Sequence, residues 1–472
     1  MKPGIIFTIV LAAAAFVINA CNQASSIIKT PVSKKIIEFG WDKPRPDQLS
    51  SATLEQSIFD GLAFRSSASD KVIVSEQLPA QSFDLDIAAL QKIKSKKLAN
   101  SFYLVLSDSS TWDWFDDTTW AAAEQNLYQH ARVAKQGGLR GIMFDPEVYQ
   151  FDLWAYASQP QKSARNFKEF ENQLRKRGAQ TMRAFERAYP GITVMYLKSF
   201  SVFETAKNDS YETAHAKLEE DGSLGLYAAF AEGMLEAATD KAVLIDGFES
   251  SYDHLRPKDF DTGRNRALNE AQILITPALR PKFTRQFRFA NSIYLDGIMN
   301  LFDSARFFGY YLPNDTERRN LIAHNIYHGL RTSDEFVWVY SESPNWWTRT
   351  LPNADLPALE NTIKRGKLEQ QSNKPLSQDP AAAVSKAETA FKARVDVGGD
   401  ITGLTGLSIT FTGLDSDCGT WNNAKRWSCT RPNNSSFTVT PTAPGVTFEP
   451  TSITFTNLTK SNWDLKFQAK TK

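Results

Sequence analysis

The chain has 472 residues and a nearly balanced charge, with 54 Lys and Arg against 53 Asp and Glu. This length suits one large domain of barrel size and a smaller one, and the balanced charge gives no reason to expect nucleic acid as a partner. Aromatic residues stand out instead, with 11 Trp, 14 Tyr and 31 Phe. We expect most of them in the core and some in positions that suit stacking against a sugar ring.

The first residues have the layout of a secretory signal peptide over 1–20, with a basic start, an apolar run and a small residue before Cys21. The apolar run is too short for a membrane span. The segment from Ile18 to Cys21 resembles the lipobox of bacterial lipoproteins, in which the cysteine is lipidated. The resemblance implies an exported protein, anchored through a lipid on Cys21 to the outer membrane or the cell surface. A polar tether is expected over 21–33.

Eight short runs of β-branched, aromatic and aliphatic residues recur between 34 and 366 and predict strands. They are Lys35–Asp42, Gly61–Ser66, Ser101–Asp108, Gly141–Glu147, Ile192–Leu197, Ala242–Glu249, Arg288–Leu295 and Glu335–Glu342. Apolar residues at helical spacing predict helices over Ala121–Lys135, Asn166–Tyr189 and Leu224–Ala238. Alternating strands and helices predict an α/β fold, a (β/α)8 TIM barrel over 34–366. An open doubly wound sheet is disfavoured, because no Gly-rich phosphate loop follows the first strand.

The last part of the chain differs in composition. The segment 367–390 is rich in Gln, Ser, Pro, Ala and Lys, which predicts a linker or an irregular helix. Short strands and turns over 391–472 then predict a small all-β sandwich domain. Residues 437–455 resemble the prealbumin-like and immunoglobulin-like repeats of bacterial surface proteins. The resemblance implies a spacer in the first place, and a weak glycan binder as the alternative.

Cys418 and Cys429 close a short loop near the C-terminus. In an exported protein this pair predicts a disulfide and not a metal site, because no second pair or nearby histidine completes a ligand set. His324 and His328 lie four residues apart on a predicted helix, but the sequence offers no third ligand. We therefore expect neither a metal site nor a cofactor.

Carboxylates end several of the predicted strands, where a (β/α)8 barrel forms its active site. The clearest case is Asp145 and Glu147, which alternate along one strand and so share a face. Two negative charges this close raise the pKa of one of the two carboxyl groups and lower the stability of the fold. Such a loss of stability is usually tolerated for function. Further acids follow other predicted strands, namely Asp42, Asp108, Asp246, Glu249 and Glu342.

Paired carboxylates between aromatic platforms fit cleavage of a glycosidic bond, in which one acid protonates the leaving oxygen and another attacks the sugar or activates water. The endings Phe144–Glu147 and Trp338–Trp347 resemble those of glycosidase-like bacterial lipoproteins, and the whole arrangement resembles (β/α)8 glycoside hydrolases. The resemblance implies a carbohydrate substrate. The sequence departs from the common retaining pattern, which puts Asn-Glu on the fourth strand and a lone Glu on the seventh, where this chain has only Asn291 and Asp296.

We expect Glu147 to act as general acid, with Asp145 tuning its pKa or its position. Glu249 or Glu342 is expected as base or nucleophile, and the distance to Glu147 decides between retention and inversion. Structural roles for Asp145 and Glu249, as a helix cap and an ion-pair partner, stay open. The residues expected to bind substrate are Trp41, Asp42, Asp108, Trp112, Tyr149, Tyr340, Trp346 and Trp347.

Two other functions fit the same residues. One is a catalytically inactive barrel that binds glycans at the cell surface. The other is a metal-assisted hydrolase that uses Asp145, Glu147 and a histidine, since carboxylate-rich rims also bind cations. Activity that survives exhaustive chelation would exclude the latter.

Overall fold

The computed structural model describes residues 33–107, 112–148, 152–203, 209–351, 355–421 and 424–472. A compact unit extends over Lys34–Lys472. The predicted signal peptide, Cys21, Asp108 and Tyr149 lie outside the described residues. Within the described part of the chain, no helix combines the length and the apolar character needed to cross a membrane.

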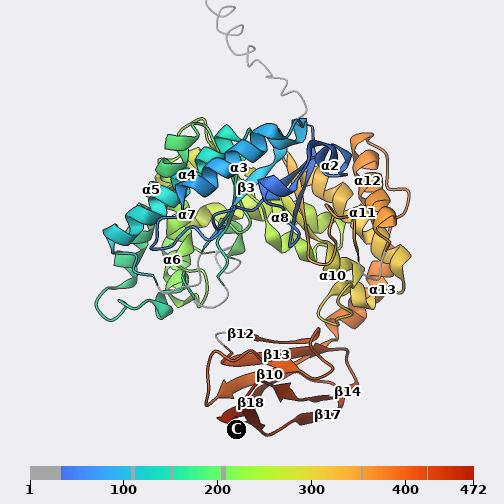
Figure 1. The fold of residues 1–472 in the computed structure, drawn as a ribbon. Helices are drawn as coiled ribbons and strands as arrows, with labels where there is room; N and C mark the ends of the chain where they lie inside the picture. Colours follow the sequence, from blue (N-terminus) through green and yellow to red (C-terminus); the bar gives the residue numbers. More distant parts are fainter. Residues whose placement is uncertain (1–32, 108–111, 149–151, 204–208, 352–354, 422–423) are drawn as a thin grey trace, which may run out of the picture. The chain divides into compact units, whose positions relative to one another are not determined.

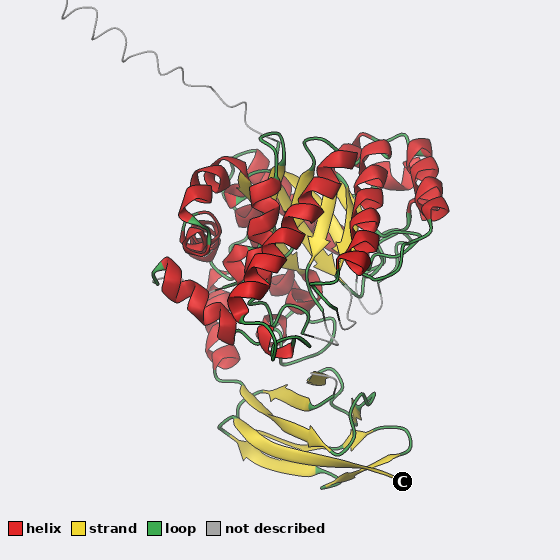
Figure 2. Ribbon diagram, turned by 90° about the vertical axis from the view of Figure 1, so that its left-hand side faces the viewer, coloured by secondary structure: helices red, strands yellow, loops and turns green. Residues whose placement is uncertain are grey.

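The first part of the compact unit is the predicted α/β barrel, in which the strands form a parallel sheet surrounded by helices (Figures 1 and 2). The strand order is β7-β6-β5-β4-β3-β2-β1-β9-β8. The strands are β1 (Lys35–Gly40), β2 (Gly61–Phe64), β3 (Phe102–Leu106), β4 (Gly141–Asp145), β5 (Thr193–Tyr196), β6 (Val243–Asp246), β7 (Phe287–Phe289), β8 (Asn291–Tyr294) and β9 (Phe336–Ser341). Each lies within or next to one of the eight predicted runs.

The predicted strand Arg288–Leu295 is divided into two at Ala290. Its first half, β7, pairs with β6, and its second half, β8, pairs with β9. Consecutive residues therefore join the two edges of the sheet and nearly close the barrel. Side chains of the loop before β9 bind the backbone at the break, since Asp334 accepts from the Phe289 amide at 2.8 Å and Ser333 from the Asn291 amide at 3.0 Å.

Strand periodicity decides which side chains reach the barrel interior. Along β4, Met143 belongs to the apolar cluster that fills the barrel, whereas Ile142 and Phe144 belong to the larger cluster beneath the helices. Both faces of a parallel barrel sheet are covered, which explains why β4 is apolar without interruption up to its end. Asp145 continues the inner row of Met143 at the C-terminal end of the strand.

Twelve α-helices are described, and they cover the sheet and link the strands. They are α2 (Ser51–Gln56), α3 (Ala80–Lys92), α4 (Asp117–Gln136), α5 (Phe167–Ala188), α6 (Tyr211–Glu220), α7 (Tyr227–Ala237), α8 (Pro257–Leu268), α9 (Arg280–Gln286), α10 (Leu295–Met299), α11 (Asp315–Thr332), α12 (Leu356–Gln371) and α13 (Ala381–Lys392). The three predicted helices correspond to α4, α5 and α7.

The segment 367–390, predicted as a linker or an irregular helix, is largely regular helix in the structure. It contains the end of α12 and most of α13. Lys367 forms an ion pair with Asp60 at 2.6 Å, and Val384 and Ala387 are buried in an apolar cluster with residues of β8 and α11. Few apolar residues are enough to fix these helices, so the sequence showed little periodicity.

The C-terminal part is the predicted all-β domain. Its strands are β10 (Val395–Thr402), β11 (Thr410–Phe411), β12 (Cys418–Trp421), β13 (Arg426–Arg431), β14 (Ser435–Val439), β15 (Pro441–Thr442), β16 (Val446–Glu449), β17 (Ile453–Leu458) and β18 (Asn462–Thr471). A five-stranded sheet in the order β12-β13-β10-β18-β16 is accompanied by the pairs β11-β15 and β14-β17. Cys418 and Cys429 lie opposite each other on β12 and β13 and form the predicted disulfide.

Candidate active site

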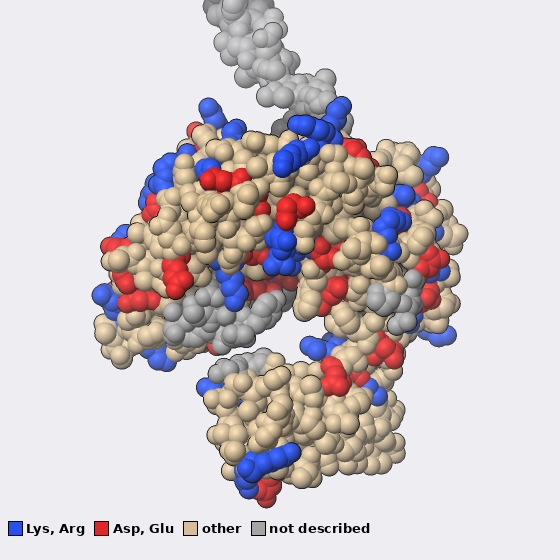
Figure 3. Space-filling model, viewed as in Figure 1, with Lys and Arg blue, Asp and Glu red and all other residues tan. Residues whose placement is uncertain are grey.

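A cavity of about 800 Å³ lies at the C-terminal ends of the barrel strands. Residues that follow β1, β4, β5, β6, β8 and β9 line it, among them Asp145, Glu147, Glu249 and Glu342. Figure 3 shows positive and negative side chains interspersed over the face in view, without a large field of one sign. The acids of the cavity are thus a local feature of the barrel rim.

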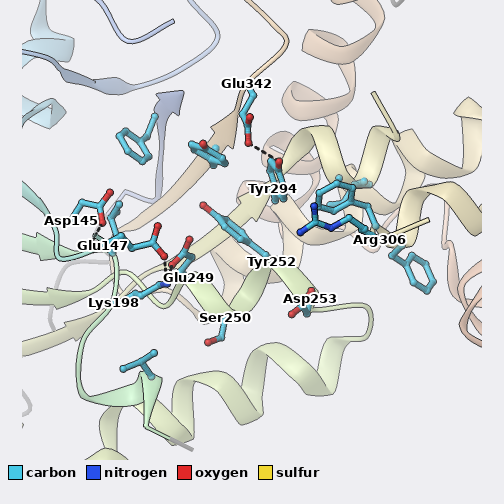
Figure 4. Close-up of a pocket in the computed structure, with 18 of the residues that line it drawn as sticks. Asp145, Glu147, Lys198, Glu249, Ser250, Tyr252, Asp253, Tyr294, Arg306 and Glu342 are labelled. Atoms are coloured by element: carbon cyan, nitrogen blue, oxygen red, sulfur yellow. Dashed lines mark hydrogen bonds and ion pairs between the residues drawn. The ribbon is translucent and has the colours of Figure 1, made fainter. Parts of the chain in front are cut away.

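One lysine joins two of the predicted catalytic acids. Lys198, which follows β5, binds Glu147 Oε1 and forms an ion pair with Glu249 Oε2 at 3.2 Å (Figure 4). All three side chains are only about one fifth exposed. Because a single ammonium contacts both carboxylates, Glu147 and Glu249 are close neighbours in the cavity.

Asp145 lies at the base of this group. Its Oδ1 accepts a hydrogen bond from the Glu147 amide at 2.9 Å and so fixes the backbone of Glu147. Burial, and after it the negative charge of Glu147, raises the pKa of Asp145 to about 7. Asp145 therefore holds a proton up to near neutral pH.

Glu249 is placed by a tight turn after β6. Asp246, which is fully buried, accepts a hydrogen bond from the Phe248 amide at 2.9 Å, and Phe248 has a left-handed backbone with φ of 42°. Such strain persists where the surroundings enforce it, commonly at functional sites. A side chain at Gly247 would come within 2.5 Å of the Tyr196 carbonyl oxygen, so the turn also requires glycine.

The environment of Glu249 favours its protonated form. Burial, and then the charge of Glu147, raises the pKa of Glu249 to about 7, although Lys198 acts in the opposite direction. For Lys198, burial alone would lower the pKa, but Glu249 and Glu147 outweigh it and the pKa lies above its ordinary value. Lys198 therefore stays charged beside the two acids.

Glu342 lies in a different part of the cavity, next to Tyr294 (Figure 4). The Tyr294 hydroxyl donates to Glu342 Oε1 at 2.7 Å. Asp296 accepts from the backbone amides of Glu342 and Ser343 at 2.9 and 2.7 Å, which fixes the end of β9. Glu342 is thus held separately from the Lys198 group.

An aromatic wall lies between the two acidic groups. It consists of Tyr252, on the 3-10 helix Glu249–Asp253, together with Tyr294 and Tyr340, and the ring centroids lie 5.3 to 6.1 Å apart. Trp41 donates from Nε1 to the Tyr340 hydroxyl at 2.6 Å and is 68% exposed. Trp41 and Tyr340 both line the cavity, where sequence analysis expected them.

Four other residues predicted to bind substrate lie away from the cavity lining. Trp112 packs against Trp114 and Trp120 in the core, and Trp346 is 5% exposed and packs edge-on against Phe59. Trp347 is half-buried against the core clusters. Asp42 accepts from the Trp346 amide at 2.7 Å and holds the loop after β9. In the structure these four residues contribute to packing and to the position of the loop after β9, and they do not line the cavity.

Sequence analysis missed Lys198, Tyr252 and Tyr294. Lys198 directly follows a predicted strand, but a lysine has neither the carboxylate nor the aromatic ring that marked the other strand ends as site residues. Tyr294 lies inside a predicted strand. Tyr252 follows Glu249 by three residues, and no periodicity indicates that the turn after β6 brings it back over the cavity.

The fold and the site define a (β/α)8 barrel protein with a carboxylate-rich cavity at the C-terminal rim. No protein-family model and no curated protein matches the chain. The chain is similar in structure to glycoside hydrolase barrels. A chitinase from Bacteroides thetaiotaomicron has 11% identity and a TM-score of 0.37, with 72% of this chain and 98% of that chain covered.

A glycoside hydrolase family 5 enzyme from Prevotella bryantii has 10% identity and a TM-score of 0.38, covering 71% of this chain and 97% of that one. A modular endo-β-1,4-mannanase from Cellulomonas fimi has 11% identity and a TM-score of 0.37, covering 91% and 94%. At these values of identity and TM-score the similarity carries no conclusion about this chain.

Proposed function

We propose that this protein is a glycoside hydrolase whose reacting acids are Glu147 and Glu249. The observation that carries the proposal is the pairing of these two carboxylates on Lys198 inside a cavity at the C-terminal rim of the barrel. Carboxyl groups about 5 Å apart suit a retaining mechanism, whereas wider pairs leave room for a water and suit inversion. The close pair favours retention.

The environments of the two acids support different roles. Glu249, with a pKa of about 7, keeps a proton near neutral pH and can give it to the leaving glycosidic oxygen. Glu147, bound by the charged Lys198, is the carboxylate that attacks the anomeric carbon as the bond to that oxygen breaks. Water then releases the sugar, with Glu249 acting as base. The sequence predicted Glu147 as the general acid; in this proposal Glu249 is the general acid and Glu147 is the nucleophile.

The remaining residues of the cavity supply binding. The wall of Tyr252, Tyr294 and Tyr340 and the exposed ring of Trp41 offer faces on which sugar rings stack. Glu342, oriented by the Tyr294 hydroxyl, can accept hydrogen bonds from sugar hydroxyls. The partner we propose is therefore an oligosaccharide or a polysaccharide.

The test is hydrolysis of a broad glycan panel by the chain from Asn22, beside Glu147→Gln, Glu249→Gln and Glu342→Gln. We expect the first two variants to lose nearly all turnover and Glu342→Gln to keep a larger share. Azide should restore turnover of Glu147→Ala as a glycosyl azide of inverted configuration, because it replaces the missing nucleophile. An unchanged rate in Glu147→Gln and Glu249→Gln would refute the proposal.

A second candidate is a glycan-binding barrel without catalysis. The observation that favours it is again Lys198, which lies between the two carboxylates and compensates their charge in the absence of substrate. This candidate predicts binding of a glycan by titration calorimetry with no product release at any pH between 4 and 9. Product release from the same glycan would exclude it.

We also propose that the protein is exported and anchored through a lipid on Cys21. The support is the lipobox-like segment from Ile18 to Cys21. Growth with a labelled fatty acid should label the wild-type protein in the membrane fraction, and Cys21→Ser should abolish the label. Labelling of Cys21→Ser would contradict this proposal.

A further inference from the structure

Three cationic side chains line the cavity, and their surroundings differ. Lys198 is paired with Glu147 and Glu249. Lys43 donates to the Gly40 carbonyl oxygen at 3.1 Å and is surrounded at longer range by acids, Asp70 foremost. In the described part of the chain, no carboxylate forms an ion pair with the guanidinium of Arg306.

Hydrogen bonds in the loop after α10 fix the backbone from Ser304 to Arg306. Ser304 Oγ accepts a hydrogen bond from the Arg306 amide at 3.2 Å, and the Tyr311 hydroxyl donates to the Ala305 carbonyl oxygen at 3.1 Å. Asn300 Oδ1 accepts from the Ser304 amide at 3.1 Å. Figure 4 shows the Arg306 side chain directed toward Tyr294. The loop therefore places Arg306 at the cavity, while the carboxylate bound to this loop, Asp417, accepts from the Ala305 amide at 2.9 Å and forms its ion pair with Arg431.

Aromatic side chains line the same end of the cavity, and Arg306 itself is exposed. Phe307 packs edge-on against Tyr294, with ring centroids 5.4 Å apart, and is pressed against Gly297, where an added Cβ would lie 3.0 Å from the Phe307 ring. Phe308 and Phe391 also line this end of the cavity. The exposed guanidinium can reach an anion that enters the cavity, and solvent screens part of the attraction between them.

We propose that the substrate carries an anionic group, a carboxylate or a sulfate ester on a sugar, which Arg306 binds. This inference rests on the proposed function and names its substrate class. The planar guanidinium donates two parallel hydrogen bonds to either group. Arg306 lies on the Tyr294 side of the cavity, away from Glu147 and Glu249 (Figure 4). The anion therefore belongs to a sugar beside the one that is cleaved.

The experiment compares matched pairs of glycans: an oligouronide with its methyl-esterified form, and a sulfated galactan with its desulfated form. The ratio of kcat/KM, anionic over neutral, is measured for the wild-type chain, Arg306→Gln and Arg306→Lys. Binding to the Glu147→Gln chain is measured by calorimetry on the same pairs. Arg183→Gln, which removes an exposed arginine of α5, is the control.

We expect the wild-type chain to prefer one anionic form by roughly tenfold or more, as hydrogen bonds between charged groups allow. Arg306→Gln should bring the ratio close to one, and Arg306→Lys should keep part of it. Preference within the uronide pair assigns a carboxylate, and preference within the galactan pair assigns a sulfate ester. The control should keep the wild-type ratio.

Equal use of the anionic and neutral forms, or a ratio that Arg306→Gln leaves unchanged, would overturn the inference, as would failure to bind any anionic glycan. Its failure is distinguishable from failure of the proposed function. If the chain cleaves neutral and anionic glycans equally well, the proposed hydrolase function stands and the proposed role of Arg306 falls. If the chain binds an anionic glycan through Arg306 but cleaves no glycan, the role of Arg306 stands and the hydrolase function falls.

Discussion

Replacement of Asp145 by Asn tests the electrostatics of the site without a substrate. The pKa of Asp145 is raised from its ordinary value of 3.8 to about 7, chiefly by burial. At about 1.4 kcal/mol per pKa unit, this shift corresponds to roughly 4 kcal/mol. Asp145 borders the open cavity, and the resulting solvent screening reduces the effect to about 2 kcal/mol.

The direction in which stability changes with pH follows from whether the folded or the unfolded chain binds the proton. Between pH 4 and 7 the folded chain keeps a proton on Asp145 that the unfolded chain has released, so the wild-type protein loses stability as the pH rises through this interval. Asparagine cannot ionise, and it retains the oxygen that accepts from the Glu147 amide. We therefore expect Asp145→Asn to be more stable than the wild type at pH 8 by about 2 kcal/mol, with little difference at pH 4.

The measurement is urea unfolding of both chains at pH 4, 6 and 8, with the disulfide intact. Asp113→Asn is the matched control, because Asp113 also accepts from the amide two residues later, that of Phe115 at 2.8 Å, but is exposed. The control should show no gain that grows with pH. A variant no more stable than the wild type at pH 8, or a difference that is the same at every pH, would refute the argument.

Three further predictions follow from the same structure. Lys198→Met removes a cation 3.2 Å from Glu249, so the pKa of Glu249 should rise by about 1 unit or more. The alkaline limb of the pH–rate profile should then move to higher pH. A limb that does not move would contradict the assignment of Glu249 as general acid. Trp346→Ala should lower the free energy of unfolding in urea by about 3 to 5 kcal/mol, because the Trp346 ring is buried. Trp41→Ala should change this free energy by less than about 0.5 kcal/mol and should weaken glycan binding in calorimetry, because the Trp41 ring is exposed. Equal losses of stability in the two variants would argue against this difference in burial. Cys429→Ser removes the disulfide that closes a short loop, and it should lower the free energy of unfolding of the β domain by about 3 kcal/mol. Unfolding is measured with and without reductant. If reductant still destabilises the variant, another bond is responsible for the effect.

The barrel could be predicted because its strands are buried on both faces and appear in the sequence as apolar runs. The break at Ala290 could not, since it depends on side chains of Ser333 and Asp334, more than forty residues further along the chain. A local pattern carries no information about such contacts.

The site, like the fold, could be predicted in part. Asp145, Glu147, Glu249 and Glu342 follow or end predicted strands, and all four line one cavity in the structure. Residue type alone does not distinguish a tryptophan that faces the cavity from one that folds back into the core, where the structure places Trp112 and Trp346. The grouping of Glu147 with Glu249 depends on Lys198, a residue that no acidic motif indicates.

The divided strand at Ala290 lies between the two acidic groups of the cavity. Glu249 is carried by the segment after β6, whereas Tyr294, Asp296 and Glu342 are carried by β8, α10 and β9. Ser292 of β8 reaches across to the turn after β6: its amide donates to Ser251 Oγ at 2.6 Å, and its hydroxyl donates to the Glu249 carbonyl oxygen at 3.0 Å. The distance between the two acidic groups is therefore set by buried hydrogen bonds from β8 to the segment that carries Glu249, and the cavity keeps its width although the strand is divided.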